Sequence, residues 1–105
     1  MNAPTIHTDE FGFLVERHTW NERVAQELAS RESIELTAAH WDIICAAHTF
    51  YDEYDLSPSM RPFIKHLKQT LNPDINSVYL LSLFPGSPAK IVSKIAGLPK
   101  PENCL

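Results

Sequence analysis

The chain has 105 residues, the size of one domain, and its 44 % hydrophobic and 21 % charged residues can support one modest core. The formal net charge of -4 opposes non-specific binding to DNA or RNA, which depends on Lys and Arg neutralising phosphates. No apolar run is long enough to cross a membrane, and the first five residues lack the order of a signal peptide, so we expect a cytoplasmic protein without membrane contact.

The first predicted element is a small β-hairpin at about residues 5–16. Two short stretches, Thr5 to Thr8 and Phe13 to Glu16, flank the sequence Asp9-Glu10-Phe11-Gly12. Gly12 supplies the backbone freedom that a tight return of the chain requires.

Helical periodicity follows the predicted hairpin. Trp20, Val24 and Leu28 recur on one face of a first helix, and Thr37 is a good N-cap for a second. The second helix has two apolar faces, which favours a central position in the fold. One face is formed by Trp41, Ile44, Cys45, His48 and Tyr51, and the other by Ile43, Ala47, Phe50 and Tyr54.

Three shorter helices complete the prediction. Ser57-Pro58 is typical of a helix start, although a start at Ser59 would make Pro62 harmless. The next helix covers Ser77 to Phe84, and Ser87-Pro88 opens a last one that runs to about Ala96 and ends at Gly97. The third helix carries a basic stripe of Arg61, Lys65 and Lys68.

Residues 97–105 are predicted to form a mobile C-terminal arm. Pro99 and Pro101 lie two positions apart, so the segment can neither continue a helix nor enter a sheet. The predicted fold is therefore mainly α. Residues 1–96 form a compact bundle of about five helices with the small N-terminal hairpin, and the arm follows.

The two cysteines lie in different contexts. Cys104 is the penultimate residue of the arm, where a thiol is exposed and can reach another protein. Glu102 and the carboxylate of Leu105 oppose its ionisation, so lysines or a partner's pocket would have to stabilise the thiolate. A cysteine near a chain end is often incidental, so the alternative is that Cys104 has no function. Cys45 lies on an apolar helix face, where a buried structural thiol is expected, and the cytoplasm disfavours a disulfide between the two.

Other chemistry finds little support in the sequence. There is no phosphate-binding glycine loop, no dinucleotide fingerprint and no Cys-x-x-Cys motif. Only Cys45 and His48 have ligand spacing, and two ligands make a poor zinc site, so we expect no metal and no organic cofactor. A helix-turn-helix in residues 57–84, with Arg61, Lys65 and Lys68 facing phosphate, is an alternative function that the net charge disfavours.

Several blocks of sequence along nearly the whole chain form a recognisable pattern. They are Asp9-Glu10-Phe11-Gly12-Phe13-Leu14, Trp20, Ile34-Glu35-Leu36-Thr37-Ala38-Ala39-His40-Trp41, Phe50-Tyr51, Ser57-Pro58, Arg61, Leu83-Phe84-Pro85-Gly86-Ser87-Pro88-Ala89-Lys90, Lys94-Ile95-Ala96-Gly97-Leu98-Pro99-Lys100-Pro101 and Cys104. In these blocks the chain resembles the DsrC/TusE family. The final block is the most specific, because it combines a long match with a penultimate cysteine.

This resemblance implies a sulfur carrier that holds a persulfide on Cys104. DsrC-type members carry a second cysteine in the last helix, where this chain has Ser93, so the TusE type is favoured. Such a sulfurtransferase accepts sulfur from a TusBCD-like donor complex and passes it to an MnmA-like tRNA thiolase that makes 2-thiouridine, so it meets tRNA only indirectly. The alternative within the family is a DsrC-like carrier that serves a sulfite-reductase-type or other sulfur-metabolism partner.

The body of the protein would then act mainly as a docking surface. Basic side chains are the candidates, although ordinary solvated charge is the simpler interpretation of them. Cys45 and His48 stand where the family usually has basic residues, and Pro62 is unusual. The docking candidates are Arg61, Lys65, Lys90, Lys94 and Lys100.

Overall fold

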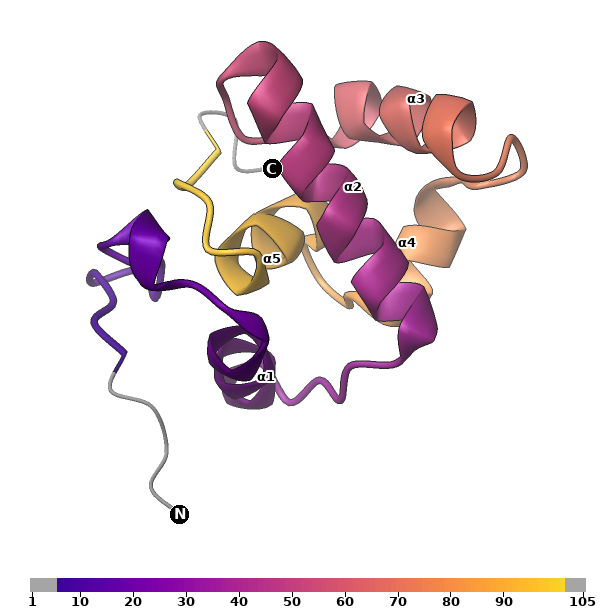
Figure 1. Cartoon of the computed structure of the whole chain (residues 1–105). Helices are drawn as coiled ribbons and strands as arrows, with labels where there is room; N and C mark the ends of the chain where they lie inside the picture. Colours follow the sequence, from indigo (N-terminus) through magenta and orange to yellow (C-terminus); the bar gives the residue numbers. More distant parts are fainter. Residues whose placement is uncertain (1–5, 102–105) are drawn as a thin grey trace.

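The computed structural model describes residues 6–101, which fold into five α-helices and one short 3-10 helix (Figure 1). The predicted mainly α fold is confirmed. None of the helices in this range combines the length and apolar composition needed to span a lipid bilayer. In chain order the elements are η1 (Arg17–Thr19), α1 (Glu22–Arg31), α2 (Ala38–Tyr54), α3 (Met60–Thr70), α4 (Ser77–Leu83) and α5 (Pro88–Ile95).

The short helix α5 lies at the centre of the fold. It packs against α1, α2, α3 and α4, which surround it in Figure 1. Val92 and Ile95 of α5 are completely buried. We expected α2 to be central because both of its faces read as apolar. Helix α2 packs on α3 and α5, and both of its predicted apolar faces are largely buried, with Ile43, Ile44 and Ala47 in the core. Helix α5, the last helix before the predicted arm, is central as well.

The solvent face of α2 carries Cys45. The prediction of a buried, structural Cys45 is wrong, because this thiol is exposed. Asp42, Thr49 and Asp52 lie at i−3, i+4 and i+7 from Cys45 and are also exposed, so they form one polar stripe with it. That stripe was a better guide to the position of Cys45 than its apolar neighbours in sequence.

Helix starts follow local capping chemistry. The side chain of Asn21 accepts a hydrogen bond from the backbone N–H of Val24 at 2.9 Å and so caps α1. Helix α3 begins after Ser59 rather than after Ser57, and its first internal bond runs from the Phe63 N–H to the Ser59 carbonyl at 3.0 Å. Pro62 therefore lies in the first turn, where its missing N–H leaves no bond unmade.

Three histidines join segments that are distant in sequence. His40 Nδ1 accepts from the Thr37 N–H at 3.1 Å, so the proton of the neutral ring lies on Nε2, which donates to a carbonyl. No group of three or more His, Cys, Asp or Glu in residues 6–101 is placed to hold a metal ion. The three joining bonds run from His40 to the Leu83 carbonyl (2.9 Å), from His48 to the Ala96 carbonyl (2.8 Å) and between His66 and the Thr49 hydroxyl (2.9 Å).

The segment before η1 reverses direction, but it does not form two strands. Within the part of the chain that the structure describes, one isolated antiparallel bridge joins Thr8 and Leu14. The predicted hairpin is therefore not confirmed, and Thr5 lies outside the described residues. Gly12 has a φ of +88°, as the predicted return requires. The return is closed by hydrogen bonds from Asp9 N–H to Phe13 O (2.8 Å) and from Val15 N–H to His7 O (2.9 Å).

Candidate functional site: the exit of the C-terminal segment

The predicted sulfur-carrying residue, Cys104, lies outside the described residues. The structure does describe the five residues that lead toward it, 97–101, which we call the exit segment. The geometry of this segment decides where the chain leaves the body and how far the thiol can travel.

A glycine-terminated cap turns the chain at the end of α5. The Gly97 N–H donates to the Lys94 carbonyl at 3.2 Å, and the Leu98 N–H donates to the Ser93 carbonyl at 2.9 Å. This pair of hydrogen bonds requires a residue in the left-handed backbone conformation, and Gly97 has a φ of +74°. A Cβ atom at this position would also lie 2.5 Å from the Trp20 ring. Gly97 is thus required both by its backbone conformation and by the close approach of the indole.

Two aromatic rings hold the last carbonyls of α5. Trp20 Nε1–H donates to the Ile95 carbonyl at 2.8 Å, and His48 Nε2–H donates to the Ala96 carbonyl at 2.8 Å. The two rings meet edge to face, with their centroids 4.5 Å apart. These bonds satisfy acceptors that a helix end otherwise leaves to water. The direction in which the chain leaves α5 is therefore fixed by α2 and by the segment before α1.

The exit segment stays on the body after the cap. Leu98 is completely buried, and Pro101 is buried as well. The Ser57 hydroxyl donates to the Pro99 carbonyl at 2.5 Å, and the Lys100 ammonium lies 3.9 Å from the centre of the Phe11 ring. Residues 97–101, the first part of the predicted mobile arm, pack against the body in this structure. Mobility of the arm stays a prediction, and residues 102–105 lie outside the described residues.

Two hollows flank the exit segment, and both are lined by Pro99 and Lys100. Their volumes are about 400 Å³ and 360 Å³. Leu56 lines the first and Val15 the second, with 54 % and 57 % of their surfaces exposed. Phe11, under Lys100, is 51 % exposed. Apolar side chains thus surround the point where the described chain ends.

The predicted docking lysines differ in availability. Lys94 is 14 % exposed, its ammonium lies 3.1 Å from the Glu32 carboxylate, and it approaches the Phe13 ring at 5.4 Å. This side chain holds α5 to the end of α1, so it is a structural residue. Lys90 is half-buried, whereas Lys100 is exposed at the exit. Of the three lysines only Lys100 is exposed, so Lys94 offers little of its charge to a partner.

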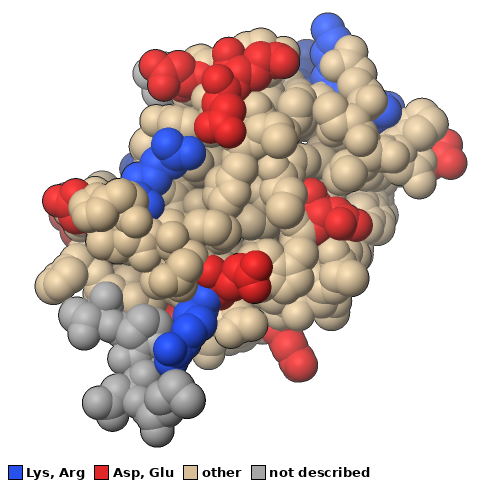
Figure 2. Space-filling model, viewed as in Figure 1, with Lys and Arg blue, Asp and Glu red and all other residues tan. Residues whose placement is uncertain are grey.

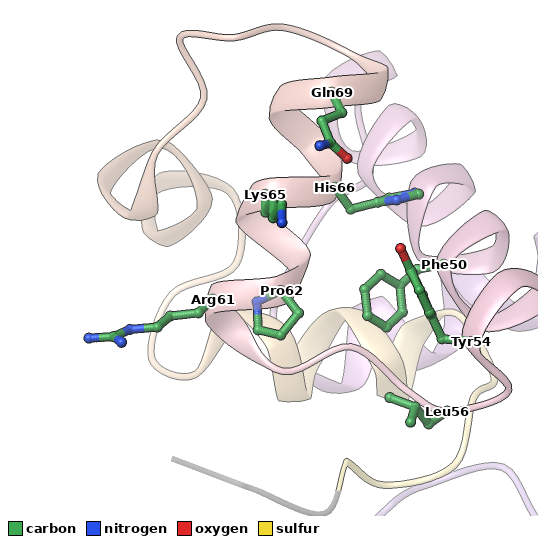
Figure 3. A pocket seen from close by; sticks show the side chains of 8 residues that line it. All are labelled: Phe50, Tyr54, Leu56, Arg61, Pro62, Lys65, His66 and Gln69. Atoms are coloured by element: carbon green, nitrogen blue, oxygen red, sulfur yellow. The ribbon is translucent and has the colours of Figure 1, made fainter.

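Arg61 and Lys65 line a third hollow, of about 590 Å³, between α2 and α3 (Figure 3). Figure 3 shows the Arg61 side chain extending away from this hollow, and Leu56 at its lower end. Since Leu56 also lines a hollow at the exit, the two depressions adjoin. The other lining residues are Phe50, Tyr54, Pro62, His66 and Gln69.

Acidic side chains lie close to this region. Asp52, Glu53 and Asp55 are exposed where α2 ends, and Figure 2 shows acidic groups gathered at that end of the molecule. Glu53 raises the pKa of the Tyr54 hydroxyl, through a side-chain hydrogen bond and through its charge, with a smaller contribution from burial. Tyr54 therefore keeps its proton at neutral pH. On the face that Figure 2 shows, the Lys and Arg side chains lie apart from one another and form no continuous basic surface.

Ser93 lies inside the core, completely buried, and its hydroxyl has no hydrogen-bond partner in residues 6–101. The family resemblance implies that two-cysteine relatives carry their second cysteine at this position. A sulfur atom, being only weakly polar, suits such surroundings better than a hydroxyl.

Sequence reasoning missed the residues that hold the exit segment, namely Trp20, His48, Ser57 and Phe11. Two of them lay within the blocks that carried the family resemblance, and Trp20 was also matched. For Phe11, Ser57 and Trp20 this match was the available signal, whereas His48 lay outside the matching blocks. Nothing in the sequence showed which segment any of the four would contact.

Comparison with known proteins places the whole chain in one family. The family described as DsrC like protein matches residues 1–105. A curated relative from Haemophilus influenzae, named sulfurtransferase TusE homolog, is 46 % identical over 106 residues, which cover 100 % of this chain and 97 % of the relative.

Solved structures agree with this assignment. The NMR structure of DsrC from Allochromatium vinosum is similar with a TM-score of 0.87 and 39 % identity, covering 100 % of this chain and 95 % of that one. The crystal structure of the oxidized gamma-subunit of dissimilatory sulfite reductase (DsrC) from Archaeoglobus fulgidus is similar with a TM-score of 0.80 and 43 % identity, covering 95 % and 92 %. The predicted resemblance is confirmed, and the chain belongs to the DsrC-like protein family.

Proposed function

We propose that this protein is a cytoplasmic sulfur carrier of the TusE type. It accepts a persulfide sulfur on Cys104 from a TusBCD-like donor complex and passes it to an MnmA-like tRNA thiolase, without binding tRNA itself. The names of the curated relatives, which are sulfurtransferases called TusE, support this role. The structural observation that supports it is the packed exit segment, which follows the surface at Pro99 and Lys100 and ends at Pro101, three residues before Cys104.

The proposed reaction is a pair of thiolate exchanges. The Cys104 thiolate attacks the outer sulfur of the donor persulfide. A new sulfur–sulfur bond forms, the donor's own sulfur–sulfur bond breaks, and the donor cysteine leaves as a thiolate. Cys104 then carries the extra sulfur as a persulfide, and the acceptor's thiolate removes it by the same step. No net oxidation occurs, so the exchange needs neither a metal nor an organic cofactor.

Two features of the chain favour a partner-assisted reaction. Glu102 is an anionic neighbour of Cys104 in sequence, and it opposes formation of the Cys104 thiolate. The basic side chain closest to the exit, Lys100, is held over the Phe11 ring. The partner therefore supplies the environment that activates the thiol, and the carrier supplies access.

A DsrC-like role with a sulfite-reductase-type partner is the second candidate. The similarity to the gamma-subunit structure favours it. Ser93 opposes it, because a serine in the buried wall of α5 cannot pair with Cys104 in a disulfide. Helix-turn-helix binding of nucleic acid is disfavoured by the net charge of -4 and by the exposed Asp52, Glu53 and Asp55 at the end of α2.

Intact-mass analysis tests the proposal. The protein is incubated with a cysteine desulfurase, cysteine and the relay that ends in the donor complex, and wild type is compared with Cys104→Ser and Cys45→Ser. We expect one added sulfur, lost only in Cys104→Ser. The Cys45→Ser variant is the necessary control because Cys45 is also exposed. Absence of sulfur on Cys104 from a relay shown to be active would refute the carrier function. Transfer of the loaded sulfur to tRNA by the thiolase then separates the TusE-type role from the DsrC-type role.

A further inference from the structure

The exit segment limits how far Cys104 can move. If the arm were free from Gly97, seven residues would separate the hinge from Cys104, a reach of about 25 Å. The molecule measures 40 × 26 × 21 Å, so an arm of that length could serve partners docked on most of its faces. With Pro101 buried on the body, three residues remain, and the reach falls to about 11 Å.

A protein that exchanges sulfur with Cys104 must therefore lie over the surface around Pro101. That surface is hollowed and carries exposed apolar side chains among polar and charged ones. Leu56 lines one hollow and Val15 the other, and the two hollows share Pro99 and Lys100. Clustered exposed apolar side chains of this kind are typical of protein interaction sites. We call this the exit surface and define it by the exposed residues Phe11, Val15, Leu56, Pro99 and Lys100.

We infer that the exit surface is the docking site for the sulfur-exchange proteins, and that donor and acceptor occupy it in turn and never together. The inference rests on the proposed function. Both exchanges take place at the same sulfur atom. Because Cys104 can move only about 11 Å from Pro101, both partners must bind at the same surface. The carrier therefore has to release the donor before the acceptor can bind.

The chemistry of the surface indicates a protein with an apolar rim rather than a nucleic acid. Arg17, beside the hollow that holds Val15, lies 3.7 Å from Asp52 and over the Tyr51 ring, so its charge is already partnered. Asp9 and Asp55 line the two hollows and would repel phosphates. Apolar contact with a protein is left as the main source of affinity.

Two substitutions, one on each side of the exit segment, test the inference in the full-length protein. Leu56→Asp and Val15→Asp place a charge on the surface, and Val78→Asp is the matched control. Val78 is 71 % exposed on α4, and α5 lies between α4 and the exit segment in Figure 1. Thermal unfolding midpoints confirm that all three variants are folded.

The rates of both half-reactions are then measured against partner concentration. We expect each exit-surface variant to lower kcat/KM by about tenfold for loading from the donor complex and also for discharge to the thiolase, as expected for a charge placed in an apolar interface core. Val78→Asp should leave both values unchanged. Loading of Cys104 by a small persulfide, glutathione persulfide, should be the same in every variant, because it needs no docking.

The outcomes separate the inference from the function on which it rests. If wild type loads normally but Leu56→Asp and Val78→Asp lose equal amounts, the docking site is wrong while the carrier function stands. If wild type does not load from an active relay, the carrier function itself fails. Loss of tRNA binding in the exit-surface variants, with both protein exchanges unaffected, would assign the surface to RNA instead.

A competition experiment tests the exclusive use of the surface. Discharge from preloaded carrier to the thiolase is followed while a donor complex without its reactive cysteine is added. We expect inhibition that more thiolase overcomes. Discharge that is unaffected by saturating donor would overturn the shared site.

Discussion

The exit segment and the exposed face of α3 both carry basic residues that the sequence marked for docking, but they are held in different ways. Just before the exit segment, Lys94 of α5 is only 14 % exposed and paired with Glu32, and the neighbouring backbone is fixed by Trp20 and by Gly97. On α3, Lys65 is exposed and makes no ion pair within residues 6–101. The charge of Lys94 thus maintains structure, whereas the charge of Lys65 is free to act on other molecules.

This difference separates two kinds of mutational effect. Substitutions of the residues that hold the exit segment should lower the free energy of unfolding. They should also impair sulfur transfer as a consequence, because they loosen the segment that leads to Cys104. Substitutions on α3 should leave stability unchanged and alter binding alone, if they alter anything. If substitutions in both regions changed the free energy of unfolding by the same amount, the exit segment would not be held by these contacts.

The largest effect is expected at Gly97. Replacement by alanine imposes a left-handed conformation on a residue with a Cβ and drives that atom into the Trp20 ring, so we expect a loss of about 3 kcal/mol in the free energy of unfolding. Gly86→Ala is the matched control, because Gly86 also has a positive φ but its Cβ would meet nothing closer than 3.9 Å. That variant should lose about 1 kcal/mol. Urea denaturation measures both, and equal losses would show that contact with Trp20 contributes nothing.

A smaller effect is expected at Trp20. Trp20→Phe keeps an aromatic ring but removes the N–H that binds the Ile95 carbonyl, so we expect a loss of about 1.5 kcal/mol. Trp41→Phe removes the same atoms from another part-buried indole, for which no hydrogen bond is found within residues 6–101, and should cost less. Hydrogen exchange adds a local measurement. The Leu98 amide, bonded to the Ser93 carbonyl, should lose protection in Trp20→Phe and keep it in Trp41→Phe.

The fold was predictable from the sequence where short-range chemistry decided it. Apolar periodicity and capping residues located all five α-helices, and Gly97 was correctly placed after the last of them. The alternative start at Ser59 was also open from the sequence, because a proline is tolerated in a first turn. The hairpin was not predictable in the same way, since strand pairing depends on packing partners that local sequence does not show.

The anchoring of the exit segment required tertiary contacts that no local pattern shows. A stretch rich in proline is compatible with an extended arm in solvent and with an extended strap on a surface. What decides between them is the Ser57 hydroxyl, 42 residues away from Pro99, and the Phe11 ring beneath Lys100. The prediction that Cys45 is buried was wrong for a related reason, because the exposure of Cys45 depends on which face of α2 packs against α5.

The smallest effect compares two lysines directly. Lys94→Met removes the ammonium beside Glu32, and because both partners are shielded from water we expect a loss of about 1 kcal/mol. Lys65→Met should change stability by less than about 0.5 kcal/mol, as is usual for an exposed charge. A double-mutant cycle with Glu32→Gln isolates the pair, since the Lys94 effect should shrink when Glu32 is already neutral. An undiminished effect would mean that Lys94 acts through its packing on Phe13 and not through its charge. The same cycle also helps to interpret the docking experiments. A binding defect in a Lys94 variant can arise from a displaced exit segment, whereas a binding defect in a Lys65 variant has to come from a lost contact between Lys65 and the partner.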